Sequence, residues 1–180
     1  MNPASLHRTA RIAGAFYLVT VLAAIASDFL LQGAFGEVIG LIAVACYIAV
    51  TVLFYAIFRQ ISRSLAILAL AANLVGVIPE ALRWAPGGIR VPMVFHGVYC
   101  LLIGYLMLKS GFLPRVLGSL MVLAGLIWLL YLDKSLIGAI TPWNTVIGLT
   151  GEALPCLWFL PFGLRKSSNN QLASAEGVGR

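Results

Sequence analysis

Six long apolar stretches occupy most of this chain, and short segments richer in polar residues separate them. A helix needs about 20 predominantly apolar residues to cross the hydrocarbon core of a bilayer, so stretches of this length predict membrane-spanning helices. The predicted spans are 12–31, 38–58, 65–82, 92–108, 116–132 and 143–164. Hydrophobic residues make up 61% of the 180 residues and charged residues only 10%, which excludes a soluble enzyme and a disordered chain. The sequence therefore predicts an all-α, polytopic membrane bundle.

The predicted bundle forms one transmembrane domain over residues 1–166. The remaining residues, 167–180, are mostly small and polar and contain no apolar run. A segment of this composition buries too little apolar surface to fold by itself, which predicts a disordered tail.

Basic residues are distributed unequally between the two sides of the predicted bundle. With a cytoplasmic N-terminus, nine of the twelve Lys and Arg residues fall on the cytoplasmic side: Arg8, Arg11, Arg59, Arg63, Lys109, Arg115, Arg165, Lys166 and Arg180. Only Arg83, Arg90 and Lys134 fall on the outer side. The positive-inside rule then predicts that both termini are cytoplasmic, as an even number of spans requires. Lipid orientation also explains the net charge of +6 without a nucleic-acid partner.

The N-terminus also fits a second interpretation. His7, Arg8 and Arg11 precede an apolar stretch that reaches Ala24-Ile25-Ala26, a sequence resembling a signal-peptide cleavage site. Cleavage there would leave five spans. Because the apolar run continues past this site to membrane-spanning length, the sequence favours an uncleaved first span.

The chain carries no recognisable cofactor or metal motif. Cys46, Cys100 and Cys156 all lie within apolar segments and lack the paired spacing of zinc ligands, which predicts buried, unpaired cysteines. Two spacings, His96 with Cys100 and Glu152 with Cys156, would place ligands on adjacent helical turns, but ordinary buried cysteines are the favoured interpretation. No hydrolase, zinc-protease or nucleotide-binding signature occurs. The sequence therefore predicts no metal, no cofactor and no assigned catalytic residue.

Polar residues within the spans point to a candidate site. Such groups are costly in hydrocarbon and usually face a bundle interior or a cavity. Glu152 lies nine residues after Trp143, about 13 Å into a core roughly 30 Å thick. Residues on the third and fourth spans share helical faces that could converge on it. The resulting candidate polar pocket, predicted to open to the outer side, consists of Asn73, Glu80, Arg83, His96, Tyr99 and Glu152.

Each of these residues also has a structural interpretation. Glu80 and Arg83 are spaced as an ion pair at a helix end, and His96 could simply bond to a neighbouring helix. Small residues, such as the Gly36 and Gly40 pair, indicate close packing between helices.

Several segments together resemble a known family. They are Phe95 to Leu106, Ser110 to Gly118, Leu123 to Gly125, Arg11 to Leu18 and Gly151 to Trp158. They are similar to the bacterial membrane proteins called domain of unknown function 4386, and the resemblance extends over nearly the whole chain. It implies a multi-pass protein of the bacterial inner (plasma) membrane. It implies no established activity and supplies no functional residues.

Three functions are compatible with these observations. The favoured one is a non-enzymatic protein of the lipid bilayer that binds or helps to transport a small polar or amphipathic molecule. The alternatives are an intramembrane enzyme that uses His96 and Glu152 as an acid/base pair, and a structural subunit of a membrane complex. The sequence sets neither the ligand nor the oligomeric state.

Overall fold

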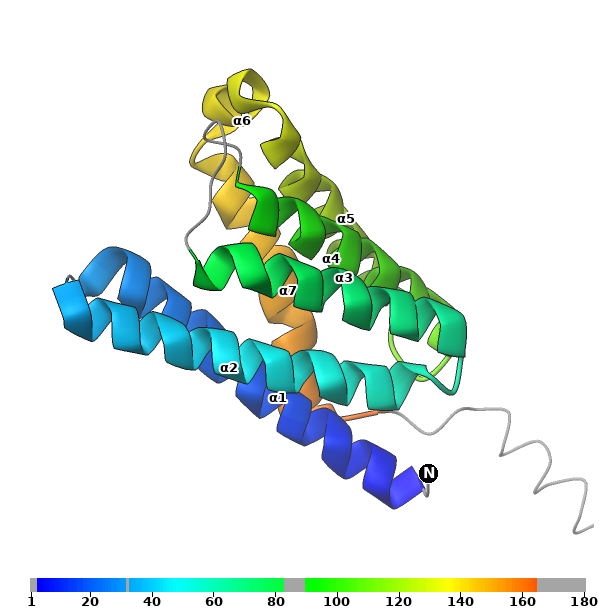
Figure 1. Cartoon of the computed structure of the whole chain (residues 1–180). Helices are drawn as coiled ribbons and strands as arrows, with labels where there is room; N and C mark the ends of the chain where they lie inside the picture. The colour runs from blue at the N-terminus through cyan, green and yellow to red at the C-terminus, as the bar shows by residue number, and fades with distance from the viewer. Residues whose placement is uncertain (1–2, 32, 83–89, 165–180) are drawn as a thin grey trace, which may run out of the picture.

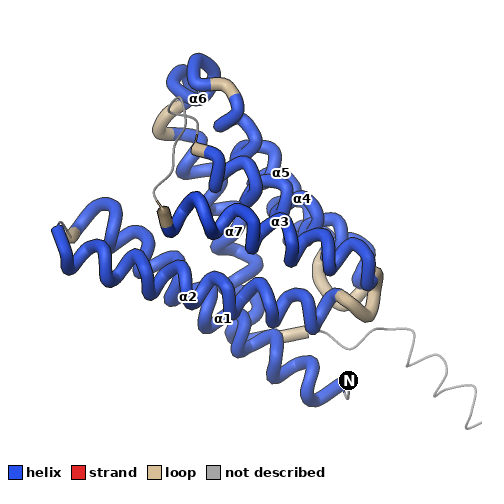
Figure 2. Tube along the Cα trace, in the orientation of Figure 1, coloured by secondary structure: helices blue, strands red, loops and turns tan. Residues whose placement is uncertain are grey.

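The computed structural model describes residues 3–31, 33–82 and 90–164 (Figure 1). Every regular element in these ranges is helical, which confirms the all-α fold (Figure 2). In chain order the elements are α1 (Pro3–Ile25), η1 (Ala26–Leu30), α2 (Gly33–Phe58), α3 (Arg63–Ala81), α4 (Val91–Ser110), α5 (Arg115–Leu129), η3 (Leu130–Leu132), α6 (Lys134–Ile140) and α7 (Trp143–Phe162). The element η1 is a π-helical turn that continues α1.

Five helices in the described part of the chain are long and apolar enough to cross a membrane. They are Ser5–Ile25, Gly33–Phe58, Val91–Ser110, Arg115–Leu132 and Trp143–Phe162. The predicted third span, 65–82, falls on α3, whose apolar part is shorter and covers Arg63–Pro79. The protein is thus a helical membrane protein in which five of the six predicted spans are supported by length and composition.

The six long helices pack in a closed ring. Each contacts the next in the order α1, α2, α3, α4, α5, α7, and α7 returns to α1. The start of α1 lies beside the end of α7, where the Arg11 Nε donates to the carbonyl oxygen of Leu160 at 3.0 Å. His7 Nδ1 lies 3.4 Å from the carbonyl oxygen of Leu164 at the same end. The beginning and the end of the described chain therefore lie on the same side of the bundle.

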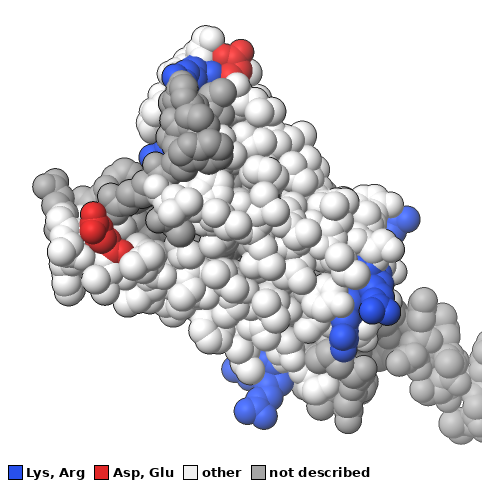
Figure 3. Space-filling view, viewed as in Figure 1, with Lys and Arg blue, Asp and Glu red and all other residues white. Residues whose placement is uncertain are grey.

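Side chains on the outside of the bundle are largely apolar. Leu22, Leu41, Ile78 and Val116 are each more than half exposed. Figure 3 shows charged side chains near the ends of the bundle, with a broad uncharged surface between them. This arrangement suits a hydrocarbon surrounding, in which exposed apolar groups carry no penalty.

The most extensive helix contact in the described part of the chain is between α4 and α5. A Cβ added at Gly104 would lie 2.9 Å from the carbonyl oxygen of Gly118, and one added at Gly97 would lie 2.9 Å from that of Gly125. The two backbones therefore touch at two levels, seven residues apart on each helix. Gly36 likewise lies against the backbone of Leu31 and Gly40 against the side chain of Ser27, so both predicted packing glycines are in close contact with the segment before α2.

A short helix, α6, joins the last two long helices. Asp133 caps it: its Oδ1 accepts from the backbone N–H groups of Ser135 at 2.8 Å and Leu136 at 3.2 Å. Hydrogen bonds from the Ser135 hydroxyl and these two amides lower the pKa of the Asp133 carboxyl. The cap is thus fully formed above the ordinary carboxyl pKa and is lost as pH falls through the lowered value.

Candidate functional site

Polar side chains from five helices meet inside the bundle. We call this group the Glu152 cluster, and its members are Tyr17 on α1, Tyr47 on α2, His96 and Cys100 on α4, Trp128 on α5, and Glu152 on α7. His96 lies five residues after the start of α4 and Glu152 nine residues after the start of α7. The cluster is therefore nearer to the end of the bundle that carries α6 than to the end that carries the N-terminus.

Glu152 is the centre of the cluster and is only 3% exposed. Its Oε2 accepts a hydrogen bond from the Tyr17 hydroxyl. Its Oε1 accepts one from Trp128 Nε1 and lies 2.8 Å from His96 Nε2. A buried carboxylate is tolerated only when it is paired and hydrogen-bonded, and here donors from three other helices meet that requirement.

The imidazole of His96 is held on both of its nitrogens. Nδ1 is hydrogen-bonded with the Tyr47 hydroxyl. Nε2 faces Glu152 and also lies 3.6 Å from Cys100 Sγ. The ring is edge-on to Tyr47 at 5.4 Å and to Trp128 at 5.7 Å between centroids. These contacts leave the imidazole one orientation, with Nε2 directed at Glu152 and Cys100.

A glycine on α7 makes room for the indole of Trp128. A Cβ at Gly148 would lie 2.5 Å from Cζ2 of Trp128, so the ring rests directly on the α7 backbone. Gly148 precedes Glu152 by four residues, which places both on one face of the helix. The indole N–H consequently reaches the carboxylate one turn away.

We expect Gly148→Ala to displace the Trp128 indole and break its hydrogen bond to Glu152. Overpacking of this kind costs about 1 to 3 kcal/mol, so the melting temperature of the protein in detergent should fall. Gly138→Ala on α6 is the matched control, because nothing lies within 4 Å of its Cβ position. Equal melting temperatures for the two variants would contradict this account of Trp128.

A second polar group adjoins the cluster on α2 and α3. The side-chain amide of Asn73, which is 2% exposed, donates to the Thr51 hydroxyl. That hydroxyl in turn donates to the carbonyl oxygen of Tyr47 at 2.9 Å. The Tyr99 ring packs edge-on against Tyr47 at 5.9 Å, so these side chains form one continuous polar and aromatic centre.

The structure therefore gathers four of the six predicted pocket residues around Tyr47: Asn73, His96, Tyr99 and Glu152. The side chain of Glu80, and Arg83 as a whole, lie outside the described residues. Sequence reasoning missed Tyr17, Tyr47 and Trp128. Their signal was a hydroxyl or an indole N–H placed well inside an apolar run, away from the interface belts where such residues usually lie.

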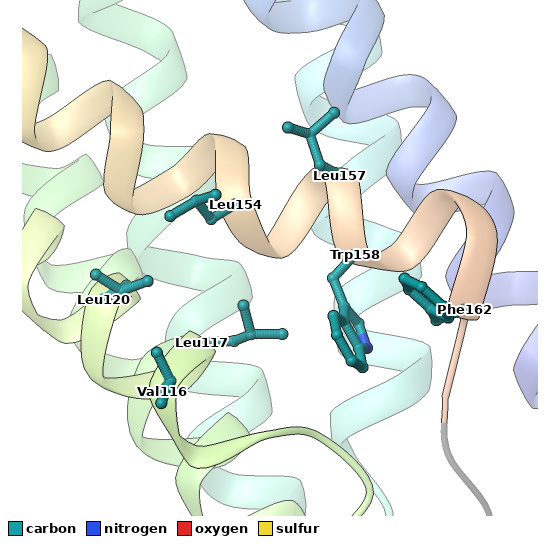
Figure 4. Close-up of a pocket in the computed structure, with 7 residues that line it drawn as sticks. All are labelled: Val116, Leu117, Leu120, Leu154, Leu157, Trp158 and Phe162. Atoms are coloured by element: carbon teal, nitrogen blue, oxygen red, sulfur yellow. The ribbon is translucent and has the colours of Figure 1, made fainter.

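The bundle surface carries two apolar hollows that are separate from the cluster. One, of about 380 Å³, lies between α5 and α7 and is drawn in Figure 4. Its lining residues are Val116, Leu117, Leu120, Leu154, Leu157, Trp158 and Phe162. The other, of about 590 Å³, lies between α3 and α4 and is lined by Val75, Ile78, Pro79, Leu82, Val91 and Phe95. Neither contains a residue of the Glu152 cluster, and both suit contact with lipid chains.

Comparison with known proteins identifies one family. The family described as domain of unknown function (DUF4386) matches residues 80–163. Four cluster residues fall within the match, while Tyr17, Tyr47 and the segment Arg11 to Leu18 precede it. Searches of curated proteins and of solved structures found no match. The resemblance predicted from the sequence is thus confirmed over residues 80–163, which are similar to the DUF4386 family.

Proposed function

We propose that this protein is a six-span protein of the bacterial inner membrane and that it binds a small polar molecule at the Glu152 cluster. The molecule enters the cluster from the outer side of the membrane. The observation that carries the proposal is a buried carboxylate whose oxygens receive hydrogen bonds from three other helices. Ionisable residues at membrane depth are rare and usually mark a substrate or ion pathway. Stabilising the bundle alone would not require so many converging polar groups, because apolar residues pack as well or better.

Two features support six spans with both termini on the cytoplasmic side. The α3 helix has 19 residues, about 28 Å at 1.5 Å per residue, and it stands in the ring between α2 and α4 like the other long helices. The start of α1 and the end of α7 lie together, as an even number of crossings requires. Arg8, Arg11, Arg59, Arg63, Lys109 and Arg115 all belong to the helix ends on that side.

Outward access is supported by the depth of the cluster. His96 and Glu152 both lie in the half of their helices that begins on the predicted outer side. The side chain of His96 is 16% exposed and that of Glu152 is 5% exposed, so the site is closed over its carboxylate. Binding would therefore require the outer ends of the helices to separate.

An intramembrane enzyme is the second candidate, because His96 Nε2 and Glu152 Oε1 lie within hydrogen-bond distance at 2.8 Å. Both imidazole nitrogens are already engaged, however, by Tyr47 and by Glu152. A general base would have to release one of these partners before it could take a proton from a substrate. The geometry therefore favours a binding site over an acid/base pair.

Labelling single cysteines with a membrane-impermeant thiol reagent tests both the topology and the access route. Each protein retains one cysteine: Gly138→Cys on α6, Gln60→Cys between α2 and α3, or the native Cys100. We expect Gly138→Cys to react in intact cells and Gln60→Cys to react only after permeabilisation. Cys100, which is fully buried in the closed bundle, should react slowly in intact cells, since the reagent must wait for outward opening.

The two engineered cysteines act as side markers for the native one, because both positions are exposed in the structure. Labelling of Gln60→Cys in intact cells would overturn the orientation. Reaction of Cys100 only after permeabilisation would place the access route on the cytoplasmic side. No reaction of Cys100 in either preparation would reduce the cluster to a structural element of the core.

A further inference from the structure

Three different metal-ligating atoms converge in the Glu152 cluster. His96 Nε2, Cys100 Sγ and an oxygen of the Glu152 carboxylate all lie within 4.8 Å of one another. Cys100 and Glu152 approach the same imidazole nitrogen, at 3.6 Å and 2.8 Å. A ring nitrogen presents one hydrogen or one lone pair, so a hydrogen bond serves only one of these partners well, whereas a metal ion placed between the three atoms serves all of them.

Two of the three separations are close to those in a tetrahedral zinc site. Zinc–nitrogen bonds of about 2.0–2.1 Å and zinc–sulfur bonds of about 2.3 Å place the two ligand atoms about 3.5–3.6 Å apart at a tetrahedral angle. His96 Nε2 and Cys100 Sγ are 3.6 Å apart, so these two side chains need not move. Nε2 and the Glu152 oxygen, now at hydrogen-bond distance, would separate by about 0.5 Å to reach the spacing of two zinc ligands. Cys100 Sγ and the Glu152 oxygen lie within 4.8 Å of each other and would move to about 3.6 Å when both bind the ion.

The surrounding residues have the arrangement expected around metal ligands. A ligating histidine usually bonds through its second nitrogen to a group that fixes the ring, and Tyr47 occupies that place at Nδ1 of His96. The Glu152 carboxylate is oriented by the Tyr17 hydroxyl and the Trp128 indole. His96 and Cys100 stand one turn apart on α4, so a single helix holds two ligands in register.

Charge balance also favours a dication in this buried position. A neutral imidazole, a thiolate and a carboxylate together carry two negative charges, so the complex with a divalent ion is neutral in a low-dielectric core. The thiol proton leaves when the ion binds, and the neutral imidazole then carries its one proton on Nδ1, where the Tyr47 oxygen can accept it, so that the lone pair of Nε2 faces the ion. Sulfur and nitrogen ligands select ions of the zinc class over magnesium or calcium.

We infer that the Glu152 cluster binds a divalent transition-metal ion of the zinc class through His96, Cys100 and Glu152. This inference rests on the proposed function and names the ligand of that site. Three protein ligands leave a fourth coordination position for water or a small anion. An open position of this kind is typical of metal sites whose non-protein ligand exchanges. The pairing of Glu152 with Cys156 considered from the sequence does not occur, because Cys156 Sγ donates instead to the carbonyl oxygen of Gly14 at 3.2 Å.

Titration of the purified metal-free protein in detergent with Co²⁺ tests the inference. Cobalt reports zinc-type sites through its visible spectrum and through a near-ultraviolet charge-transfer band that requires a thiolate ligand. We expect one equivalent of Co²⁺ to produce both features and Zn²⁺ to abolish them by displacement. Cys100→Ser should lose the charge-transfer band, whereas Cys156→Ser, the matched control, should retain the full spectrum.

Tyr47→Phe provides a milder test that keeps all three ligands. Removing a group that orients a ligand typically lowers metal affinity about 10- to 100-fold, so this variant should keep the charge-transfer band with weaker binding. A wild-type protein without the band, or a band that persists in Cys100→Ser, would overturn the metal site.

The cobalt titration and the labelling of Cys100 fail independently when the cells are labelled in the presence of a metal chelator, because a bound ion would itself protect the Cys100 thiolate. Labelling from outside without a cobalt band would refute the metal ion and leave the proposed polar binding site in place. A cobalt band without labelling from either side would support a resident metal ion and refute the outward-opening site.

Discussion

Replacing Glu152 with leucine is expected to destabilise the bundle by about 3 kcal/mol or more, because each buried group left without its hydrogen-bond partner costs about 1 to 3 kcal/mol. Leucine fills a similar volume but accepts no hydrogen bond. The hydroxyl of Tyr17, the indole N–H of Trp128 and Nε2 of His96 would all lose their acceptor in a closed core. Thermal unfolding of the purified protein in detergent measures the effect as a lower melting temperature.

A carboxyl group elsewhere on the protein serves as the control for Glu152. Glu37 is exposed near the start of α2, and its replacement by leucine should change the stability by no more than about 1 kcal/mol, because the contacts of an exposed carboxylate contribute little. A double variant adds a sharper comparison. Removing His96 as well, by His96→Phe, should cost less than the sum of the two single losses, because the second change removes a group already left unpaired. Additive losses would show that His96 and Glu152 are not coupled.

The glutamine variant of Glu152 separates function from stability. The amide has nearly the same shape, so Glu152→Gln should melt much closer to the wild type than Glu152→Leu. An amide lacks the charge that a cation or a cationic ligand requires, so ligand binding should be lost in both variants. Unchanged melting together with unchanged ligand binding would reduce Glu152 to a tolerated polar residue.

The helices could be predicted because run length in lipid leaves few alternatives. The predicted span 143–164 corresponds to α7 at Trp143–Phe162, and 38–58 corresponds to the main part of α2 at Gly33–Phe58. The first helix begins much earlier than predicted, at Pro3. Its polar first turns resemble a flanking segment in the sequence, yet they pack beside the end of α7, where Arg11 donates to the backbone. A contact of this kind joins segments that are far apart in the sequence, so no local sequence pattern predicts it.

The site was predicted in part for a related reason. His96 and Glu152 are conspicuous because each is polar within an apolar run, and their helical faces suggested that they converge. Tyr17, Tyr47 and Trp128 were missed because an aromatic residue counts as apolar in a hydropathy pattern, although each brings one donor to the centre. Periodicity assigns residues to a helix face, but it does not decide which faces of different helices meet.

Helix pairing was the least predictable feature. The sequence drew attention to Gly36 and Gly40, whose four-residue spacing is a familiar packing signal. Both glycines are in close contact, but the most extensive helix contact in the described residues uses glycines seven residues apart on both α4 and α5. The seven-residue spacing can be recognised as a contact surface only when it is known that α4 packs against α5.

Gly104→Leu is expected to cost about 3 kcal/mol or more, because the new side chain would have to enter a contact between two backbones. Its Cβ alone would lie 2.8 Å from the backbone nitrogen of Val122 and 2.9 Å from the carbonyl oxygen of Gly118. Overpacking costs about 1 to 3 kcal/mol where side chains can shift, and backbone atoms of a neighbouring helix yield less. Helices in a bilayer gain little from apolar burial, so close packing is a main source of their association.

The consequence should extend from this contact to the Glu152 cluster. The α4–α5 contact holds His96 and Cys100 on one helix beside Trp128 on the other, so forcing the helices apart moves two of the donors away from Glu152. Gly138→Leu, placed where nothing lies within 4 Å, is the control for adding the same side chain without a clash. We therefore expect Gly104→Leu to melt earlier than Gly138→Leu and also to expose the Cys100 thiol to labelling. A lower melting temperature with Cys100 still protected would mean that the cluster is held together by its own hydrogen bonds and does not depend on the glycine contact beside it.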